Sequence, residues 1–96
     1  MDLGKQIQSL RKNKALTQED FAQECDITQT YLSQIENNQK EPTISVLKKI
    51  SNVLKVPLPI LFYLSMDEND VIPEKREAFL LLEPSIKSLI RGFFTI

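Results

Sequence analysis

The sequence predicts an all-α fold, with five short helices in one domain and a helical extension at its C-terminal end. Apolar residues recur at steps of three and four along most of the 96 residues, and no segment shows the period-two alternation of a strand. Threonines that can cap a helix precede three of these periodic stretches. A chain of this length suits one compact domain with a modest extension.

The first three helices follow from apolar spacing and capping residues. A helix is predicted over residues 3–13, because three apolar residues share one face: Leu3, Ile7 and Leu10. Thr17 can cap a second helix, whose inner face would be Phe21, Ala22 and Cys25. A short turn through Asp26 leads to Thr28, which can cap a third helix. That helix should end near Asn37–Asn38, since asparagine tolerates the left-handed conformation that ends helices.

Two further helices complete the predicted domain, residues 1–65. Pro42 breaks the third helix, and Thr43 can cap a fourth, whose inner positions would be Ile44, Leu47, Ile50 and Leu54. Pro57 and Pro59 suit the first turn of a fifth helix, which would end near Ser65.

An acidic linker, residues 66–72, precedes a helical extension over residues 73–96. The apolar stripe of the extension keeps its phase across Pro84, so the sequence allows one kinked helix or two short helices that share a face. The stripe consists of Phe79, Leu82, Ile86, Leu89, Ile90 and Phe93.

Composition excludes several classes of protein. The chain has no histidine and a single cysteine, which removes the commonest general base, a zinc-ligand cluster and an internal disulfide. We therefore expect neither an enzyme nor a metal or cofactor site, and Cys25 is interpreted as a small core residue. The longest mostly apolar run, residues 56–64, is far shorter than the roughly 20 residues that span a bilayer, so a cytoplasmic protein is expected.

The net charge of −1 argues at first against a nucleic-acid partner, because DNA affinity depends on neutralising phosphates. The charges are unevenly spread: residues 1–56 hold eight Lys/Arg and seven Asp/Glu, whereas residues 57–96 hold four against six. The objection therefore applies less to the N-terminal part of the chain.

One face of the third predicted helix is polar and uncharged, with Gln29, Thr30, Ser33, Gln34 and Asn37. A solvated helix face usually carries Glu and Lys. Glutamine instead presents a donor and an acceptor that match the major-groove edge of adenine, and Ser and Thr bond either base type. Taken alone, this face could be an ordinary solvent-exposed helix face. Its context favours a functional role, because a capped helix, a short turn and a second capped helix form a helix-turn-helix unit.

Residues 16–22 (LTQEDFA) and 28–37 (TQTYLSQIEN) resemble the phage Cro and repressor type of helix-turn-helix, which is called XRE-like. The resemblance covers about residues 3–64 and implies a five-helix, repressor-like domain. Asp26 and Asn38 stand where that family usually has glycine, and both residue types tolerate positive φ. Thr30 replaces a longer polar residue of several relatives, so its base preference is not inherited.

The resemblance implies a role for individual positions. The base contacts would be Gln29, Thr30 and Gln34, with Ser33 beside them. The contacts to DNA phosphates would be Gln18, Asn37, Gln39 and Lys40, and Lys12 near the end of the first helix adds a charge within reach of a phosphate strand. Arg11 and Glu36 would bridge the first helix to the end of the third; the alternative is a surface ion pair worth under about 1 kcal/mol.

These expectations combine into a sequence-specific transcriptional regulator, a repressor by family habit, that binds double-stranded DNA as a homodimer on an operator with two half-sites. The dimer interface would combine the fifth helix, through Leu58, Leu61 and Phe62, with the apolar stripe of the extension. Two alternatives remain open at this stage. The stripe could fold back on its own domain, or the chain could be an interaction module such as an antitoxin, whose tail binds a partner protein and whose DNA binding is autoregulatory.

Overall fold

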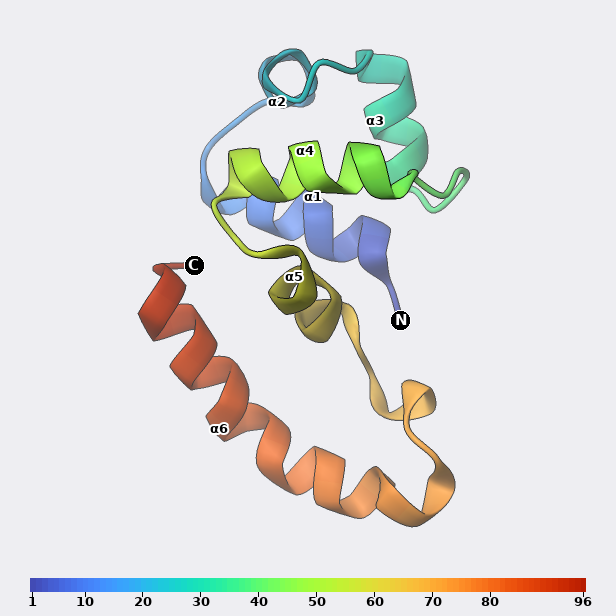
Figure 1. The fold of residues 1–96 in the computed structure, drawn as a ribbon, viewed down its shortest axis with the longest axis vertical. Helices are drawn as coiled ribbons and strands as arrows, with labels where there is room; N and C mark the ends of the chain where they lie inside the picture. Colours follow the sequence, from blue (N-terminus) through green and yellow to red (C-terminus); the bar gives the residue numbers. More distant parts are fainter.

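The computed structural model describes residues 1–96 and is helical throughout, as the sequence predicts. The first five helices form a compact body, and most of the last helix extends beyond it, at the end away from α3 (Figure 1). The helices are α1 (Leu3–Asn13), α2 (Gln18–Glu24), α3 (Gln29–Glu36), α4 (Ile44–Leu54), α5 (Leu58–Ser65) and α6 (Arg76–Phe94), with 3₁₀ turns at Glu68–Asp70 and Pro73–Lys75.

The three predicted threonine caps are confirmed. The side-chain oxygens of Thr17, Thr28 and Thr43 each accept a hydrogen bond from the backbone N–H three residues later, at 3.1, 3.0 and 3.2 Å. Each cap satisfies a donor that the helix itself leaves free, and such a cap stabilises a helix by about 1 kcal/mol.

The core lies between the first five helices and has one mispredicted member. Phe21, Leu32 and Leu61 are completely buried, and Cys25 is among the remaining core residues, as expected. Ile44, which was predicted to face inward, is 56% exposed. It is the first residue of α4 and projects beyond the edge of the core, while the inner face of that helix is carried by Leu47, Ile50 and Leu54.

Five residues other than glycine have positive φ, and several of them end a helix or a turn. Asp26 (φ 56°) and Asn38 (φ 58°) occupy positions that the sequence marks as tolerant of this conformation. Ala15 (φ 57°) and Lys55 (φ 58°) were not expected there, because a Cβ is disfavoured in the left-handed region by about 1–2 kcal/mol.

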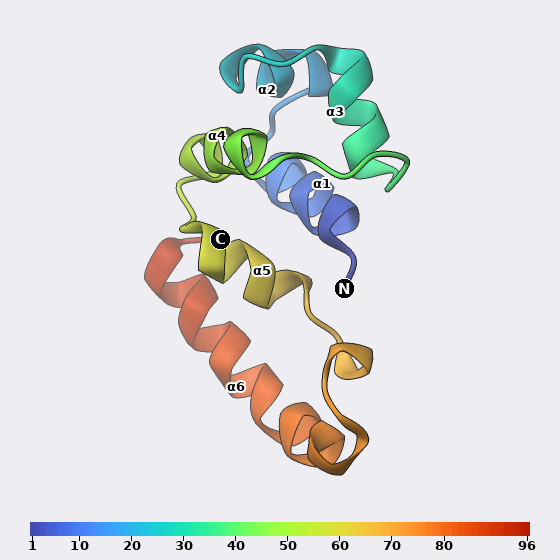
Figure 2. The same ribbon diagram turned by 45° about the vertical axis from the view of Figure 1, so that its right-hand side comes forward.

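The extension forms a single helix that continues through Pro84, so the two-helix alternative is not adopted. Ile90 and Ile96 pack against the core, and the C-terminal end of α6 lies beside α5 in both views (Figures 1 and 2). Leu89 and Phe93 instead point to solvent, with 74% and 81% of their surface exposed. None of the helices combines the length and apolar character that crossing a membrane requires.

Candidate nucleic-acid interface

Helices α2 and α3 form a helix-turn-helix unit at one end of the molecule (Figure 2). The backbone N–H of Ile27 donates to the Ala22 carbonyl at 3.0 Å, and the left-handed conformation of Asp26 turns the chain between the two helices. Phe21 in α2 and Leu32 in α3 are both completely buried in the core below this turn. The second helix is therefore held by its inner side, and its outer side is free.

The outer side of α3 is the uncharged polar face. Gln29 and Thr30 are exposed, whereas Ser33 and Gln34 are half-buried. The opposite side is formed by Leu32 and Ile35, with Tyr31 half-buried against the core. The structure thus brings the four residues predicted to contact bases onto one helix and places them on its accessible side.

A buried network joins α1, α2 and the end of α3. The Arg11 guanidinium donates from Nε to Glu36 Oε2 at 2.7 Å and from Nη2 to Glu36 Oε1 at 3.0 Å. The Glu36 side chain is completely buried and that of Arg11 is 7% exposed. The structure therefore brings the two residues of the expected bridge together, with the two parallel bonds of an Arg–carboxylate pair.

Gln18 belongs to this network, which sequence reasoning missed. Its side-chain Nε2 donates to Glu36 Oε1 at 3.0 Å, so the amide nitrogen expected at a DNA phosphate is directed inward. The first hydrogen bond of α2 runs from the Phe21 N–H to the Thr17 carbonyl. The backbone N–H groups of Gln18 and Glu19 precede this bond and are the donors that a helix start offers to an anion.

The loop after α3 carries most of the other residues expected at phosphates. The backbone N–H groups of Gln39 and Lys40 donate to the Gln34 carbonyl at 2.8 and 3.3 Å, which holds this loop at the end of α3. Asn37 is exposed, and its amide donates back to the Ser33 carbonyl at 3.0 Å. Lys12 lies apart from this loop, exposed in the last turn of α1.

The structure divides the residues predicted at a dimer interface into three kinds. Leu61 is completely buried in its own domain, so its prediction as an interface residue is wrong. Leu58, Phe62 and Ile90 are half-buried against the same core, and Phe79 is also half-buried. The members that remain exposed belong to α6: Leu82, Ile86, Leu89 and Phe93.

The remaining reactive group, Cys25, is inert. Burial is the main cause that raises the pKa of its thiol to about 11, and the nearby charge of Glu24 acts in the same direction. The thiolate that reacts as a nucleophile or binds metals is therefore scarce at neutral pH. No group of three or more His, Cys, Asp or Glu side chains is placed to hold a metal ion.

Comparison with known proteins identifies relatives of this fold. The family model described as "Helix-turn-helix" matches residues 7–61. The control protein C.MunI of Mycoplasma sp is 42% identical over 60 residues, which are 62% of this chain and 81% of that protein. The transcriptional regulator RamB of Mycobacterium tuberculosis is 32% identical over 78 residues, but these are 81% of this chain and only 16% of RamB.

Two solved structures of the regulator SinR are also similar. SinR in complex with DNA superposes with a TM-score of 0.60 and 34% identity, covering 62% of this chain and 97% of that one. The complex of SinR with the SinI protein gives a TM-score of 0.60 and 27% identity, covering 90% of this chain and 98% of that one. The second comparison therefore extends beyond the five-helix body into the C-terminal region.

Proposed function

The chain belongs to the XRE-like, phage-repressor family of helix-turn-helix DNA-binding transcriptional regulators, and we propose that it represses transcription by occupying a DNA operator that α3 reads. The observation that carries this proposal is the uncharged, accessible face of α3, supported from behind by the buried Arg11–Glu36 pair. The second helix of such a unit enters the major groove with its N-terminal end first.

Gln29, Thr30 and Gln34 are the residues we assign to base contacts, with Ser33 beside them. Gln29 and Thr30 are exposed in the first turn of α3, which is the part of a recognition helix that reaches the bases. A glutamine amide pairs with both N6 and N7 of adenine, and the threonine methyl can contact that of thymine.

Phosphate contacts would fix the register of α3 on the duplex without reading sequence. The donors we assign to them are the backbone N–H groups at the start of α2 and the side chains of the loop after α3, Asn37, Gln39 and Lys40. Lys12 would add a positive charge within reach of the DNA phosphates. DNA affinity should fall measurably as the salt concentration rises. Because the surface is small and most of these donors are neutral, we expect this fall to be modest.

Selection of bound DNA from a random library tests the proposal. We expect the selection to yield a preferred half-site. Replacing Gln29 or Gln34 by Ala should then weaken binding to this half-site by about 1–3 kcal/mol and relax the sequence specificity. Gln8→Ala in α1 is the matched control, because it removes a glutamine amide that lies outside the polar face of α3. Recovery of no preferred sequence, or equal effects of all three variants, would contradict the assignment.

We further propose that the protein binds its operator as a homodimer through α6. The exposed residues Leu82, Ile86, Leu89 and Phe93 follow one another at steps of four, three and four, which is the spacing of a seam between two helices. A soluble chain seldom leaves such a continuous apolar stripe in water. A second copy of the same helix presents the same stripe and would cover it.

The mass of the protein in solution tests this interface. Sedimentation equilibrium of the full chain should give about twice the 11.1 kDa of one copy, and a chain truncated after Ser65 should give one copy. Leu89→Glu should also dissociate the dimer, because it buries an unpaired charge in the seam. Ser88→Glu places the same charge elsewhere on α6 and should leave the mass unchanged; an unchanged dimer after truncation would refute this interface.

A second candidate function is regulation by a different protein that binds α6, as in an antitoxin. It is favoured by the similarity to SinR in its complex with SinI, which covers 90% of this chain. A monomeric full-length protein whose α6 stripe stays exposed would favour this candidate over the homodimer.

A further inference from the structure

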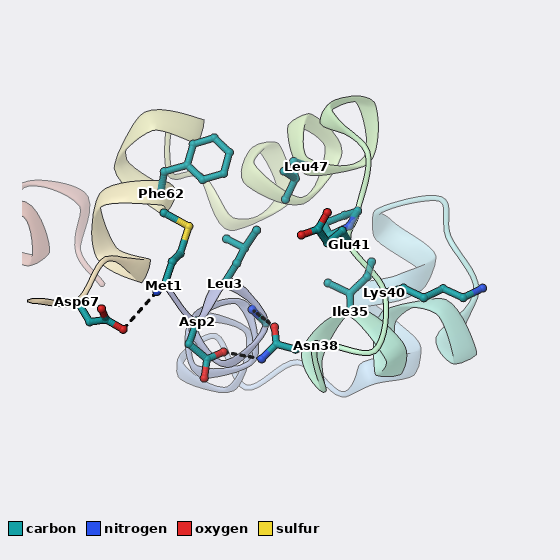
Figure 3. A pocket seen from close by; sticks show the side chains of 12 residues that line it. Met1, Asp2, Leu3, Ile35, Asn38, Lys40, Glu41, Leu47, Phe62 and Asp67 are labelled. Atoms are coloured by element: carbon teal, nitrogen blue, oxygen red, sulfur yellow. Dashed lines mark hydrogen bonds and ion pairs between the residues drawn. The ribbon is translucent and has the colours of Figure 1, made fainter. Parts of the chain in front are cut away.

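Asn38 makes contacts that its role as a helix terminator does not require. It follows α3 in the left-handed conformation, for which glycine would serve equally well. Its side chain reaches across to the start of α1 (Figure 3). Oδ1 accepts a hydrogen bond from the Gly4 N–H at 3.1 Å, and Nδ2 donates to Asp2 Oδ1 at 2.8 Å.

Gly4 allows α1 to approach the end of α3 this closely. A Cβ at this position would lie 2.3 Å from the Ile35 carbonyl oxygen and 2.5 Å from Asn38 Oδ1. No other residue type fits without moving one helix away from the other. The first turn of α1 and the last carbonyl groups of α3 are thus in direct contact, and Asn38 closes this contact with hydrogen bonds.

Asp2 connects this contact to α5. Its carboxylate caps α1 by accepting from the Lys5 N–H at 3.0 Å, and its own N–H donates to the carbonyl of Ser65, the last residue of α5, at 3.1 Å. The hydrogen bond from Asn38 is the main reason why the pKa of Asp2 lies below its ordinary value. The end of α3 is therefore tied through one residue, Asp2, to α1 by its carboxylate and to α5 by its backbone N–H.

We propose that Asn38 is a positioning residue for DNA reading, which fixes the orientation of α3 through Asp2 and Gly4. The proposal rests on the proposed function, in which α3 reads bases. Eight residues of helix span about 12 Å, so a rotation of about 10° at the Asn38 end displaces the Gln29 end by about 2 Å. Hydrogen bonds tolerate a few tenths of an ångström, whereas attraction to phosphates is far less directional. Loosening Asn38 should therefore impair specific binding more than non-specific binding.

The ratio of specific to non-specific DNA affinity tests the proposal, with the full chain and the selected half-site as probes. Asn38→Gly keeps the favoured backbone conformation and removes only the amide. We expect this ratio to fall about tenfold, the equivalent of one hydrogen bond to a charged group, while non-specific affinity is retained. Asn52→Gly in α4 is the control, because it lowers the melting temperature through the backbone and should leave the ratio unchanged.

A charge exchange separates positioning from general stability. Asn38→Asp places a second carboxylate against Asp2 and should lower the ratio at least as far as Asn38→Gly. Combining Asn38→Asp with Asp2→Asn restores a donor opposite an acceptor and should recover most of the ratio. An unchanged ratio in Asn38→Gly, or no recovery in the double variant, overturns the positioning role. A wild-type protein without sequence preference instead overturns the proposed function, and the positioning role with it.

Discussion

Replacing Glu36 by Gln is the most informative single test of how α3 is supported. The Glu36 carboxylate is completely buried and accepts two hydrogen bonds from Arg11 and one from Gln18. All three groups that face the carboxylate are N–H donors, so the amide of a glutamine at this position would have to turn its own NH₂ group toward one of them. The substitution also leaves the Arg11 guanidinium buried without a counter-charge.

The expected loss of stability follows from this burial. Removing one partner of a buried ion pair costs about 3–5 kcal/mol, because the remaining charge is left uncompensated. A domain of this size has a total free energy of unfolding of roughly 5–15 kcal/mol. Each kcal/mol corresponds to about 4–8 °C in a small domain, so Glu36→Gln should lower the melting temperature by roughly 12–40 °C.

Urea denaturation followed by circular dichroism measures this loss, with all variants at one protein concentration because a dimer would stabilise the fold by mass action. Glu41→Gln is the control: this glutamate is exposed in the loop before α4, and its loss should change stability by less than about 0.5 kcal/mol. The double variant Arg11→Met, Glu36→Leu should be more stable than Glu36→Gln, since it leaves no unpaired charge. A loss below about 1 kcal/mol in Glu36→Gln would refute the argument from burial.

Three further predictions concern single residues. Ala15→Gly should raise the free energy of unfolding by about 0.5–1 kcal/mol, because glycine adopts the positive φ of this position without strain. The control Ala78→Gly lies within α6 and should lower the free energy of unfolding. Denaturant titration compares the two variants, and no gain in stability at residue 15 would contradict the strain. The buried Cys25 thiol, with its pKa raised to about 11, should react with a thiol reagent at pH 8 only as fast as the protein unfolds, and rapid labelling of the native state would contradict its burial. Because the pKa of Asp2 is lowered on folding, the stability that its carboxylate contributes is complete above its unfolded pKa of about 4 and is lost as the pH falls through the folded value. The difference in stability between wild type and Asp2→Asn should therefore shrink below about pH 4, and a difference that is constant with pH would refute this linkage.

Local chemistry made the helices predictable, whereas their ends and outer contacts were less so. A threonine cap acts on the N–H three residues later, so Thr17, Thr28 and Thr43 could be recognised from sequence alone. Ile44 was misassigned because the helical period extends back to the first residue of α4, while the core beneath that helix does not reach so far. In α6, neighbouring apolar residues lie on both faces, and only packing against α5 determines which of them is covered.

The polar contacts behind the uncharged face of α3 could not be predicted from spacing. Gln18 and Glu36 are 18 residues apart, and Asp2 and Asn38 are 36 apart. A short polar side chain carries the same sequence signal whether it caps a helix, binds a phosphate or joins two helices. Gly4 is the exception in principle: a glycine inside a helical stretch costs stability, and close approach of another segment is one physical reason to retain it.

The negative net charge of the chain is compatible with a DNA partner because the excess of acidic residues lies in the C-terminal part: residues 57–96 hold six Asp/Glu against four Lys/Arg, whereas residues 1–56 hold seven against eight. The segment around residues 66–77 is at the opposite end of the molecule from α3, along a longest dimension of 41 Å (Figure 1). Electrostatic interactions between exposed charges are screened over about 8 Å at physiological ionic strength. The acidic end would therefore contribute little potential where α3 is proposed to meet the duplex. In the proposed arrangement an uncharged face would supply sequence selectivity, while backbone donors and a few lysines would hold the phosphates.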